Sequence, residues 1–253
     1  MVKAYSTTDI GRKRTTNQDY VFASTEQVGK LPNLFLVADG MGGHNAGDFA
    51  SRYAAEIMVQ EIRRSEEDQI ASILRHAIEA ANAMIRLKAS EDSAMLGMGT
   101  TLVAASIKGK LMEVANVGDS RLYVAEDTLH QITRDHSLVE EMVRMGGLKP
   151  EEARKHPDKN IITRAVGASP TVRADMFEVE LSQGCLVLLC SDGLTNMLED
   201  EEICSILKED ASLKAKAERL ITRANEKGGR DNIAVVLIDP FDSGNEVWNG
   251  EEA

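Results

Sequence analysis

Short apolar segments separated by turn residues dominate the hydrophobic pattern of the chain. Six of these segments predict β-strands, at 34–38, 101–107, 111–117, 121–125, 185–190 and 233–238. Lys108-Gly109-Lys110 is a tight-turn signal between the second and third segments, so we expect these two to form an antiparallel hairpin. Apolar residues at helical spacing predict four helices, at 46–64, 67–90, 199–208 and 212–227.

The predicted helices come in pairs among consecutive strands, which favours an α+β layer protein with antiparallel sheet over a repeating βαβ fold. Residues 137–167 break the pattern, because they are polar and contain Gly146-Gly147 and two prolines. This segment predicts a flap over a site. We expect one folded domain over 1–240, followed by an acidic tail at 241–253.

Charge and composition restrict the partners of this chain. The 253 residues include 29 basic and 41 acidic side chains, giving a formal net charge of -12, and only 4% of residues are aromatic. A nucleic-acid partner is therefore not expected, because a phosphate backbone attracts basic surfaces and bases stack on aromatic side chains. The excess of carboxylates suits cations instead.

The cysteine spacing and the N-terminal residues predict a cytoplasmic protein. Cys185, Cys190 and Cys204 have no CxxC spacing, so neither a disulfide framework nor a zinc site is expected. The first residues contain no apolar signal-peptide core, and no apolar run approaches the roughly 18 residues needed to span a bilayer. We expect a cytoplasmic location without membrane insertion.

Five aspartates occupy turn-like positions close to predicted strand ends. They are Asp19 in RTTNQD, Asp39 in VADGMGGH, Asp119 in NVGDSR, Asp192 in CSDG and Asp231 in GGRDN. Each one alone is explained by the frequency of Asp and Gly in turns, but several carboxylates at one sheet edge form a site for hard cations. Oxygen ligands without His or Cys pairs favour Mg²⁺ or Mn²⁺ over Zn²⁺. Two such ions can share a bridging water that attacks a phosphoryl group.

Phosphate chemistry also requires a cationic side chain and a proton donor. Arg14 offers a planar fork for bidentate contact with phosphate, although a solvated arginine in the basic cluster Arg12-Lys13-Arg14 is the alternative. His44, at the end of DGMGGH, is placed to protonate a leaving serine or threonine alkoxide. An ordinary surface or packing role is the alternative for this histidine.

Eight motifs in a fixed order carry a resemblance to a known family. They are RTTNQD, ADGMGGH, GTT at 99–101, NVGDSR, DHS at 135–137, TRAVG at 163–167, SDGLT and GGRDN. In this order the chain resembles the metal-dependent protein phosphatases of type 2C, in their compact bacterial form, over about residues 3–239. The resemblance implies a sandwich of two antiparallel β-sheets flanked on both outer faces by paired α-helices, with 1–240 as the phosphatase catalytic domain.

The resemblance also implies a metal site. Asp39 would bridge two Mn²⁺ or Mg²⁺ ions, and the carbonyl of Gly40 would be a further ligand. Asp192 and Asp231 would complete the ligands of one ion, and Asp19 would act directly or through water.

Further positions match the family with two departures from its animal members. Asp119 matches the residue that helps to hold a third, weaker ion, and Arg14 matches the phosphate-binding arginine. Gln18 stands where animal members carry Glu, and Met41 stands where they carry the histidine. Here His44 comes three residues later, as in bacterial members.

The resulting hypothesis is a protein-serine/threonine phosphatase. A hydroxide bridging the two ions would attack phosphoserine or phosphothreonine directly, without a phospho-enzyme and without any cysteine. By resemblance we expect a monomer whose partners are phosphorylated proteins, including a Ser/Thr kinase that it opposes. Three alternatives remain: a non-catalytic phosphoprotein-binding module, an enzyme for another phosphate ester, and a structural interaction protein.

Overall fold

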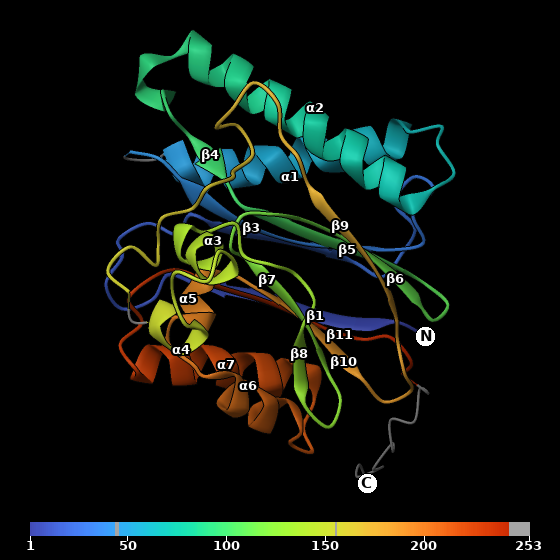
Figure 1. Ribbon diagram of the computed structural model, residues 1–253. Coiled ribbons are helices and arrows are strands. Elements are labelled where there is room, and N and C mark those ends of the chain that lie inside the picture. The colour runs from blue at the N-terminus through green and yellow to red at the C-terminus, as the bar shows by residue number, and fades with distance from the viewer. Residues whose placement is uncertain (44–45, 155, 243–253) are drawn as a thin grey trace, which may run out of the picture.

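Two antiparallel β-sheets pack face to face in the computed structural model, which describes residues 1–43, 46–154 and 156–242. Figure 1 shows α1 (Ala46–Arg64) and α2 (Ile70–Glu91) over the outer face of one sheet. The outer face of the other sheet is covered by α6 (Asp200–Leu207) and α7 (Leu213–Glu226). The predicted α-β-β-α order of layers is confirmed.

The two sheets take their strands from separate parts of the chain. The first has the order β1-β11-β10-β7-β8, with β1 (Lys3–Asp9), β7 (Arg121–Ala125), β8 (Leu129–Gln131), β10 (Leu186–Cys190) and β11 (Ile233–Asp239). The second has the order β2-β3-β5-β6-β9, with β2 (Asp19–Ser24), β3 (Leu34–Met41), β5 (Leu102–Lys108), β6 (Leu111–Val117) and β9 (Asp175–Glu180). The short β4 (Gly99–Thr100) pairs with the end of β3.

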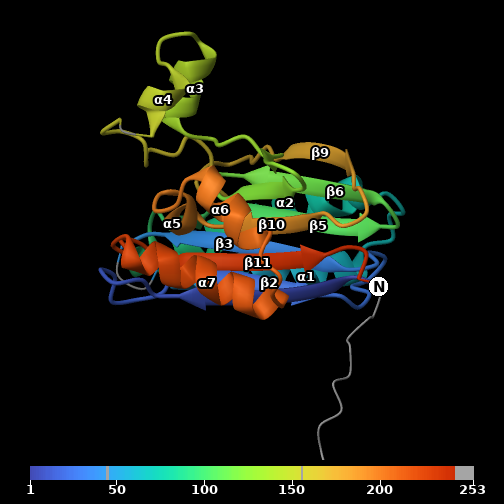
Figure 2. The ribbon, with the colours of Figure 1, turned by 90° about the horizontal axis from the view of Figure 1, so that it is seen from below.

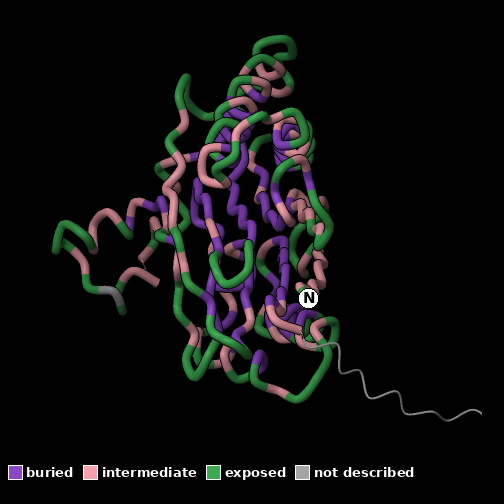
Figure 3. The backbone as a smooth tube through the Cα atoms, turned by 90° about the vertical axis from the view of Figure 1, so that its right-hand side faces the viewer, coloured by how far each residue is buried: buried purple, intermediate pink, exposed green. Residues whose placement is uncertain are grey.

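Apolar side chains fill three layers between these elements. Along β3 the side chains alternate, so that Leu36 packs beneath α1 and α2 while Phe35 and Val37 pack between the two sheets. On the other side of the molecule, Leu188 and Leu220 pack between the first sheet and its helices. The central strands are thus buried on both faces, as the buried segments of the tube in Figure 3 show.

The apolar pattern located the central elements correctly. All six predicted strands and all four predicted helices are present, with end shifts of a few residues. The predicted hairpin is β5–β6, in which Lys108 pairs with Leu111 and Gly109 takes a φ of 65° in the turn. β1, β2, β4, β8 and β9 were not predicted.

The segment 137–167 contains two short helices, α3 (Leu138–Arg144) and α4 (Pro150–Ala153). Figure 2 shows them projecting from the sandwich. Isolated bridges tie the base of the segment, between Ser137 and Ile162 and between Thr100 and Val166.

Two further short helices are η1 (Ser93–Met95) and α5 (Asp192–Thr195). Among the described helices, none has the length and apolar character required to cross a membrane. Residues 243–253, which form most of the predicted tail, lie outside the described residues.

Candidate active site

Two of the predicted carboxylates face each other on neighbouring strands of the second sheet. Asp19 begins β2 and pairs in register with Asp39 of β3. Asp39 was expected just beyond its strand, but β3 continues to Met41 because the short β4 pairs with its end. The backbone of Asp39 is held on both sides, since its N–H donates to Thr101 Oγ1 at 3.0 Å and its carbonyl accepts from Thr100 Oγ1 at 2.9 Å.

The first sheet supplies two more carboxylates. Asp192 follows β10 as the first residue of α5, and Asp231 lies just before the adjacent β11. The turn at α5 requires Gly193, because a Cβ there would lie 1.8 Å from the carbonyl oxygen of Asn232. Neighbouring strands therefore bring Asp192 and Asp231 to the same end of this sheet.

Ser191 links the two sheets at this site. Its hydroxyl donates to Asp19 Oδ2 at 2.6 Å and accepts from the N–H of Ala234 at 2.9 Å. Ser191 is completely buried, so both hydrogen bonds are shielded from water. This role could not be inferred from the sequence, because the hydroxyl joins residues 172 positions apart.

Burial and mutual repulsion disfavour the charged forms of these acids. The pKa of Asp19 is raised to about 8: burial raises it most, the hydrogen bond from Ser191 lowers it, and the charge of Asp192 raises it. Burial and the charges of Asp19 and Asp192 raise the pKa of Asp39 well above its ordinary value. The pKa of Asp192 is raised to about 6, by burial and then by the charge of Asp231. The four carboxylates therefore lie close enough to influence one another.

Asp119 lies beside this group, in the connection between β6 and β7. Its pKa is raised to about 8, first by burial and then by the charges of Asp192 and Asp135. Asp119, Asp192 and Lys159 line a cavity of about 470 Å³ beneath the helices of the segment 137–167. The structure thus brings the predicted third-ion residue next to Asp192.

The donor set fits divalent cations in its chemistry. Asp19 Oδ1 and Asp192 Oδ1 are buried oxygens without a hydrogen-bond partner among the described residues, and such oxygens are costly unless a cation or proton satisfies them. Within residues 1–43, 46–154 and 156–242, no three Asp, Glu, His or Cys side chains already stand in a ready-made metal-binding group. The buried carboxylates, which repel one another and leave two oxygens without a partner, therefore indicate a site for cations.

The carbonyl of Gly40 lies against the start of α1. A Cβ on Gly47 would lie 2.9 Å from this oxygen and 2.4 Å from Gln18 Nε2. The N–H of Gly40 donates to the carbonyl of Gln18 at 3.0 Å. Gln18, Gly40 and Gly47 therefore pack with no room for another side-chain carbon.

Arg14 reaches the site from the loop between β1 and β2. Its Nη2 lies 2.7 Å from Asp231 Oδ2, and 48% of its side chain is exposed. The hydrogen bond to Asp231, opposed by burial, raises the pKa of Arg14, and the charge of Asp39 adds to the effect. Gly11 allows this loop to approach, since a Cβ there would lie 2.2 Å from the carbonyl oxygen of Asp231. His44, the predicted proton donor, lies outside the described residues.

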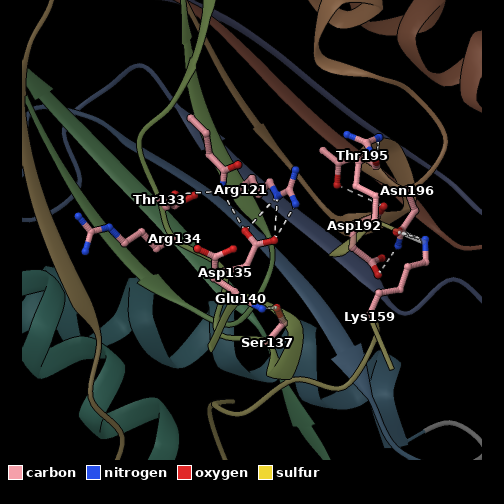
Figure 4. Close-up of polar contacts among 12 residues, drawn as sticks. Arg121, Thr133, Arg134, Asp135, Ser137, Glu140, Lys159, Asp192, Thr195 and Asn196 are labelled. Carbon is pink, nitrogen blue, oxygen red and sulfur yellow. Dashed lines mark hydrogen bonds and ion pairs between the residues drawn. The ribbon is translucent and has the colours of Figure 1, made fainter. Parts of the chain in front are cut away.

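Two polar contacts connect the segment 137–167 to the carboxylates (Figure 4). Lys159 Nζ donates to Asn196 Oδ1 at 2.7 Å, and Asn196 Nδ2 donates to Asp192 Oδ2 at 2.8 Å. On the other side of the same cavity, Arg121 Nη2 lies 2.7 Å from Asp135 Oδ2. Sequence reasoning missed Lys159 and Asn196, because neither belongs to a motif.

The cysteines have the properties of inert thiols. Burial raises the pKa of Cys185 and of Cys190, which keeps both thiols protonated and poorly nucleophilic at neutral pH. Cys204 is partly exposed in α6, on the outer layer of the molecule. These positions agree with a reaction that uses no cysteine.

Known proteins resemble this chain over nearly its whole length. The family model for protein phosphatase 2C matches residues 10–237. The serine/threonine phosphatase stp of Listeria welshimeri is 43% identical over 239 residues, covering 92% of this chain and 93% of its own.

Solved structures show the same relationship. The serine/threonine phosphatase of S. agalactiae has a TM-score of 0.88 and 37% identity, covering 95% of this chain and 100% of its own. The catalytic domain of the serine/threonine phosphatase PstP, in complex with two manganese ions, has a TM-score of 0.84 and 33% identity, covering 95% of this chain and 99% of its own. The chain therefore belongs to the protein phosphatase 2C family and is a serine/threonine protein phosphatase.

Proposed function

We propose that the enzyme hydrolyses phosphoserine and phosphothreonine in proteins with the help of two Mn²⁺ or Mg²⁺ ions. The observation that carries this proposal is the group of buried carboxylates with raised pKa values, two of which have an oxygen without a hydrogen-bond partner in the described chain. Asp39, Asp19, Asp192 and Asp231, with the carbonyl of Gly40, would hold the ions. The two manganese ions in the PstP structure support this number.

The ions, when bound, would supply an activated water and neutralise phosphoryl charge. Arg14 would bind the substrate phosphate, because a guanidinium has five N–H donors and only Nη2 is engaged by Asp231. His44 would protonate the leaving oxygen. Asp119, next to Asp192, would contribute to a third and weaker ion.

The phosphoryl group would pass to water directly, without a covalent enzyme intermediate. The buried thiols support this, since they stay protonated in the apolar interior. We further propose that 1–240 is the catalytic domain with 137–167 as its flap, and that the enzyme is a cytoplasmic monomer opposing a Ser/Thr kinase.

The test is hydrolysis of a phosphothreonine peptide with Mn²⁺, with Mg²⁺ and with a chelator. We expect activity only with a divalent ion, and its loss in Asp192→Ala. Asp210→Ala, which removes an exposed carboxylate beyond α6, is the matched control and should keep full activity. If folded, metal-loaded enzyme left the peptide intact, or if Asp192→Ala retained activity, this assignment of substrate or of metal ligand would be wrong.

A further inference from the structure

Three arginines surround one hollow on the face between α2 and β9. Arg75 projects from α2, Arg134 lies between β8 and α3, and Arg173 lies just before β9; together they line a hollow of about 590 Å³. Figure 1 shows the chain segment leading into β9 as it passes α2. In Figure 4 the side chain of Arg134 points away from Arg121 and Asp135.

None of these arginines has a side-chain hydrogen bond or ion pair within the part of the chain that the structure describes. Several other arginines of this acidic protein do, as Arg223 does with Glu202 at 2.9 Å, whereas Arg63 and Arg86 on α1 and α2 have no such partner among the described residues. The three exposed guanidinium groups of the hollow therefore remain available to an anion, although the chain carries a net charge of -12.

The acidic residues of the same hollow do not neutralise it. Asp175 is engaged by Arg164 at 2.9 Å and by His136 at 3.1 Å, so its charge is already compensated. Glu79 remains as a second carboxylate against three arginines. Among the described lining residues, positive charges outnumber negative ones. This excess of positive charge favours a ligand with more than one negative charge.

A second, smaller hollow extends from the arginines toward the end of β3. It has a volume of about 310 Å³, extends from Met41 to Arg173, and shares Val172 and Arg173 with the arginine hollow. Met41 is the last residue of β3, two positions beyond Asp39. An extended peptide whose phosphorylated residue lies at Asp39 can follow this surface toward the arginines.

We propose that Arg75, Arg134 and Arg173 bind a second phosphorylated residue of the same substrate protein. This inference rests on the proposed function. A phosphorylated side chain carries close to two negative charges and three acceptor oxygens, which match several guanidinium forks better than one carboxylate does. Binding there would raise the local concentration of the residue to be hydrolysed and would act on KM.

The experiment compares three phosphothreonine peptides. One has no other anion, one carries a non-hydrolysable phosphonate residue at increasing spacing, and one carries Glu at the same positions. We expect the phosphonate to lower KM about tenfold at the best spacing with kcat unchanged, which corresponds to a few charge-assisted contacts at an exposed site. Glu should give a much smaller gain.

Two double variants test whether the arginine hollow causes the decrease in KM. Arg75→Gln with Arg173→Gln should abolish most of the phosphonate gain without changing turnover of the singly phosphorylated peptide. Arg63→Gln with Arg86→Gln, on α1 and α2, makes the same change in net charge elsewhere and should keep the gain. Arg134 is left intact because its neighbour Asp135 pairs with Arg121.

The outcomes separate this inference from the proposed function. No phosphonate gain at any spacing, a gain that survives in the Arg75 and Arg173 double variant, or an equal gain with Glu would each overturn the phosphate-docking site. If the singly phosphorylated peptide were not hydrolysed, the proposed function would fail instead. In that case, the fluorescence anisotropy of a labelled phosphonate peptide in chelator would measure binding to the arginine hollow directly. Binding that is lost in the Arg75 and Arg173 double variant would support the site. Equal binding by wild type and this variant, or no binding at all, would overturn it.

Discussion

Replacing Ser191 by alanine removes the hydroxyl that joins the two sheets at the candidate site. Asp19 Oδ2 then loses its donor at 2.6 Å, while Oδ1 already lacks a hydrogen-bond partner in the described structure. The N–H of Ala234 also loses its acceptor. The substitution therefore affects both the carboxylate and a buried backbone group.

Loss of the acceptor for Ala234 should lower stability, whereas loss of the donor to Asp19 should weaken metal binding. A buried N–H without an acceptor costs about 1–3 kcal/mol, so the free energy of unfolding should fall by that amount. A hydrogen bond to a charged group contributes about 1.5–3 kcal/mol, and its loss makes the carboxylate form of Asp19 less favourable. Because 1.4 kcal/mol is about tenfold in binding, we expect Mn²⁺ affinity to fall about 10- to 100-fold.

Calorimetric titration with Mn²⁺ and urea unfolding in chelator measure the two effects separately. Ser106→Ala is the matched control, because Ser106 is also completely buried but donates to the carbonyl of Asn33 at 2.8 Å on β5. It should cost about 1 kcal/mol of stability and leave Mn²⁺ affinity unchanged. Equal Mn²⁺ affinity in wild type and Ser191→Ala would refute the assignment of Asp19 as a metal-site carboxylate held by Ser191.

Three further predictions follow from the site. The pKa of Asp19 is about 8 in the folded state against an ordinary 3.8, so the folded state binds the proton more tightly. The free energy of unfolding in chelator should therefore fall as pH rises from about 4 to 8, and Asp19→Asn should flatten this slope; an unchanged slope in urea titrations would contradict the shift. Gly47→Ala should lower stability by about 1–3 kcal/mol and weaken Mn²⁺ binding, because its Cβ would lie 2.9 Å from the backbone carbonyl oxygen of Gly40, a predicted metal ligand, besides displacing the side chain of Gln18. Gly43→Ala, whose Cβ would meet nothing within 4 Å, is the control, and equal melting temperatures for the two variants would count against the tight packing. Cys204→Ser should keep wild-type turnover of a phosphothreonine peptide, whereas loss of activity in the folded variant would indicate a cysteine in the reaction.

The strands that sequence reasoning missed share one physical property. Apart from the two-residue β4, they are the edge strands β1 and β8 of one sheet and β2 and β9 of the other. An edge strand is buried on fewer sides, and the residues of β1, for example, are all only partly buried. β1, β8 and β9 lack a continuous apolar run, whereas most of the central strands, which are buried on both faces, carry one. β2 does contain a run, Tyr20-Val21-Phe22-Ala23, but it is only four residues long and three of these residues are only partly buried.

The sequence also predicted some parts of the candidate site better than others. The five aspartates could be found because each lies in a short motif, and most have a neighbouring glycine that lets the chain turn. The contacts that hold them could not be found, because Ser191 reaches Asp19 and Lys159 reaches Asn196 only after the chain has folded. Motifs identify chemical groups, but the donors that orient these groups come from distant segments.

Metal binding and folding would be coupled in this protein, because the carboxylates of the candidate site come from both sheets. Asp19 and Asp39 lie on strands of one sheet, and Asp192 and Asp231 lie next to the ends of strands β10 and β11 of the other, so their mutual repulsion acts between the two sheets. The apolar layer between the sheets, which includes Phe35, opposes that repulsion. Cations that bind these carboxylates would replace repulsion with attraction at the same interface, so each ion would stabilise the sandwich by its own binding free energy.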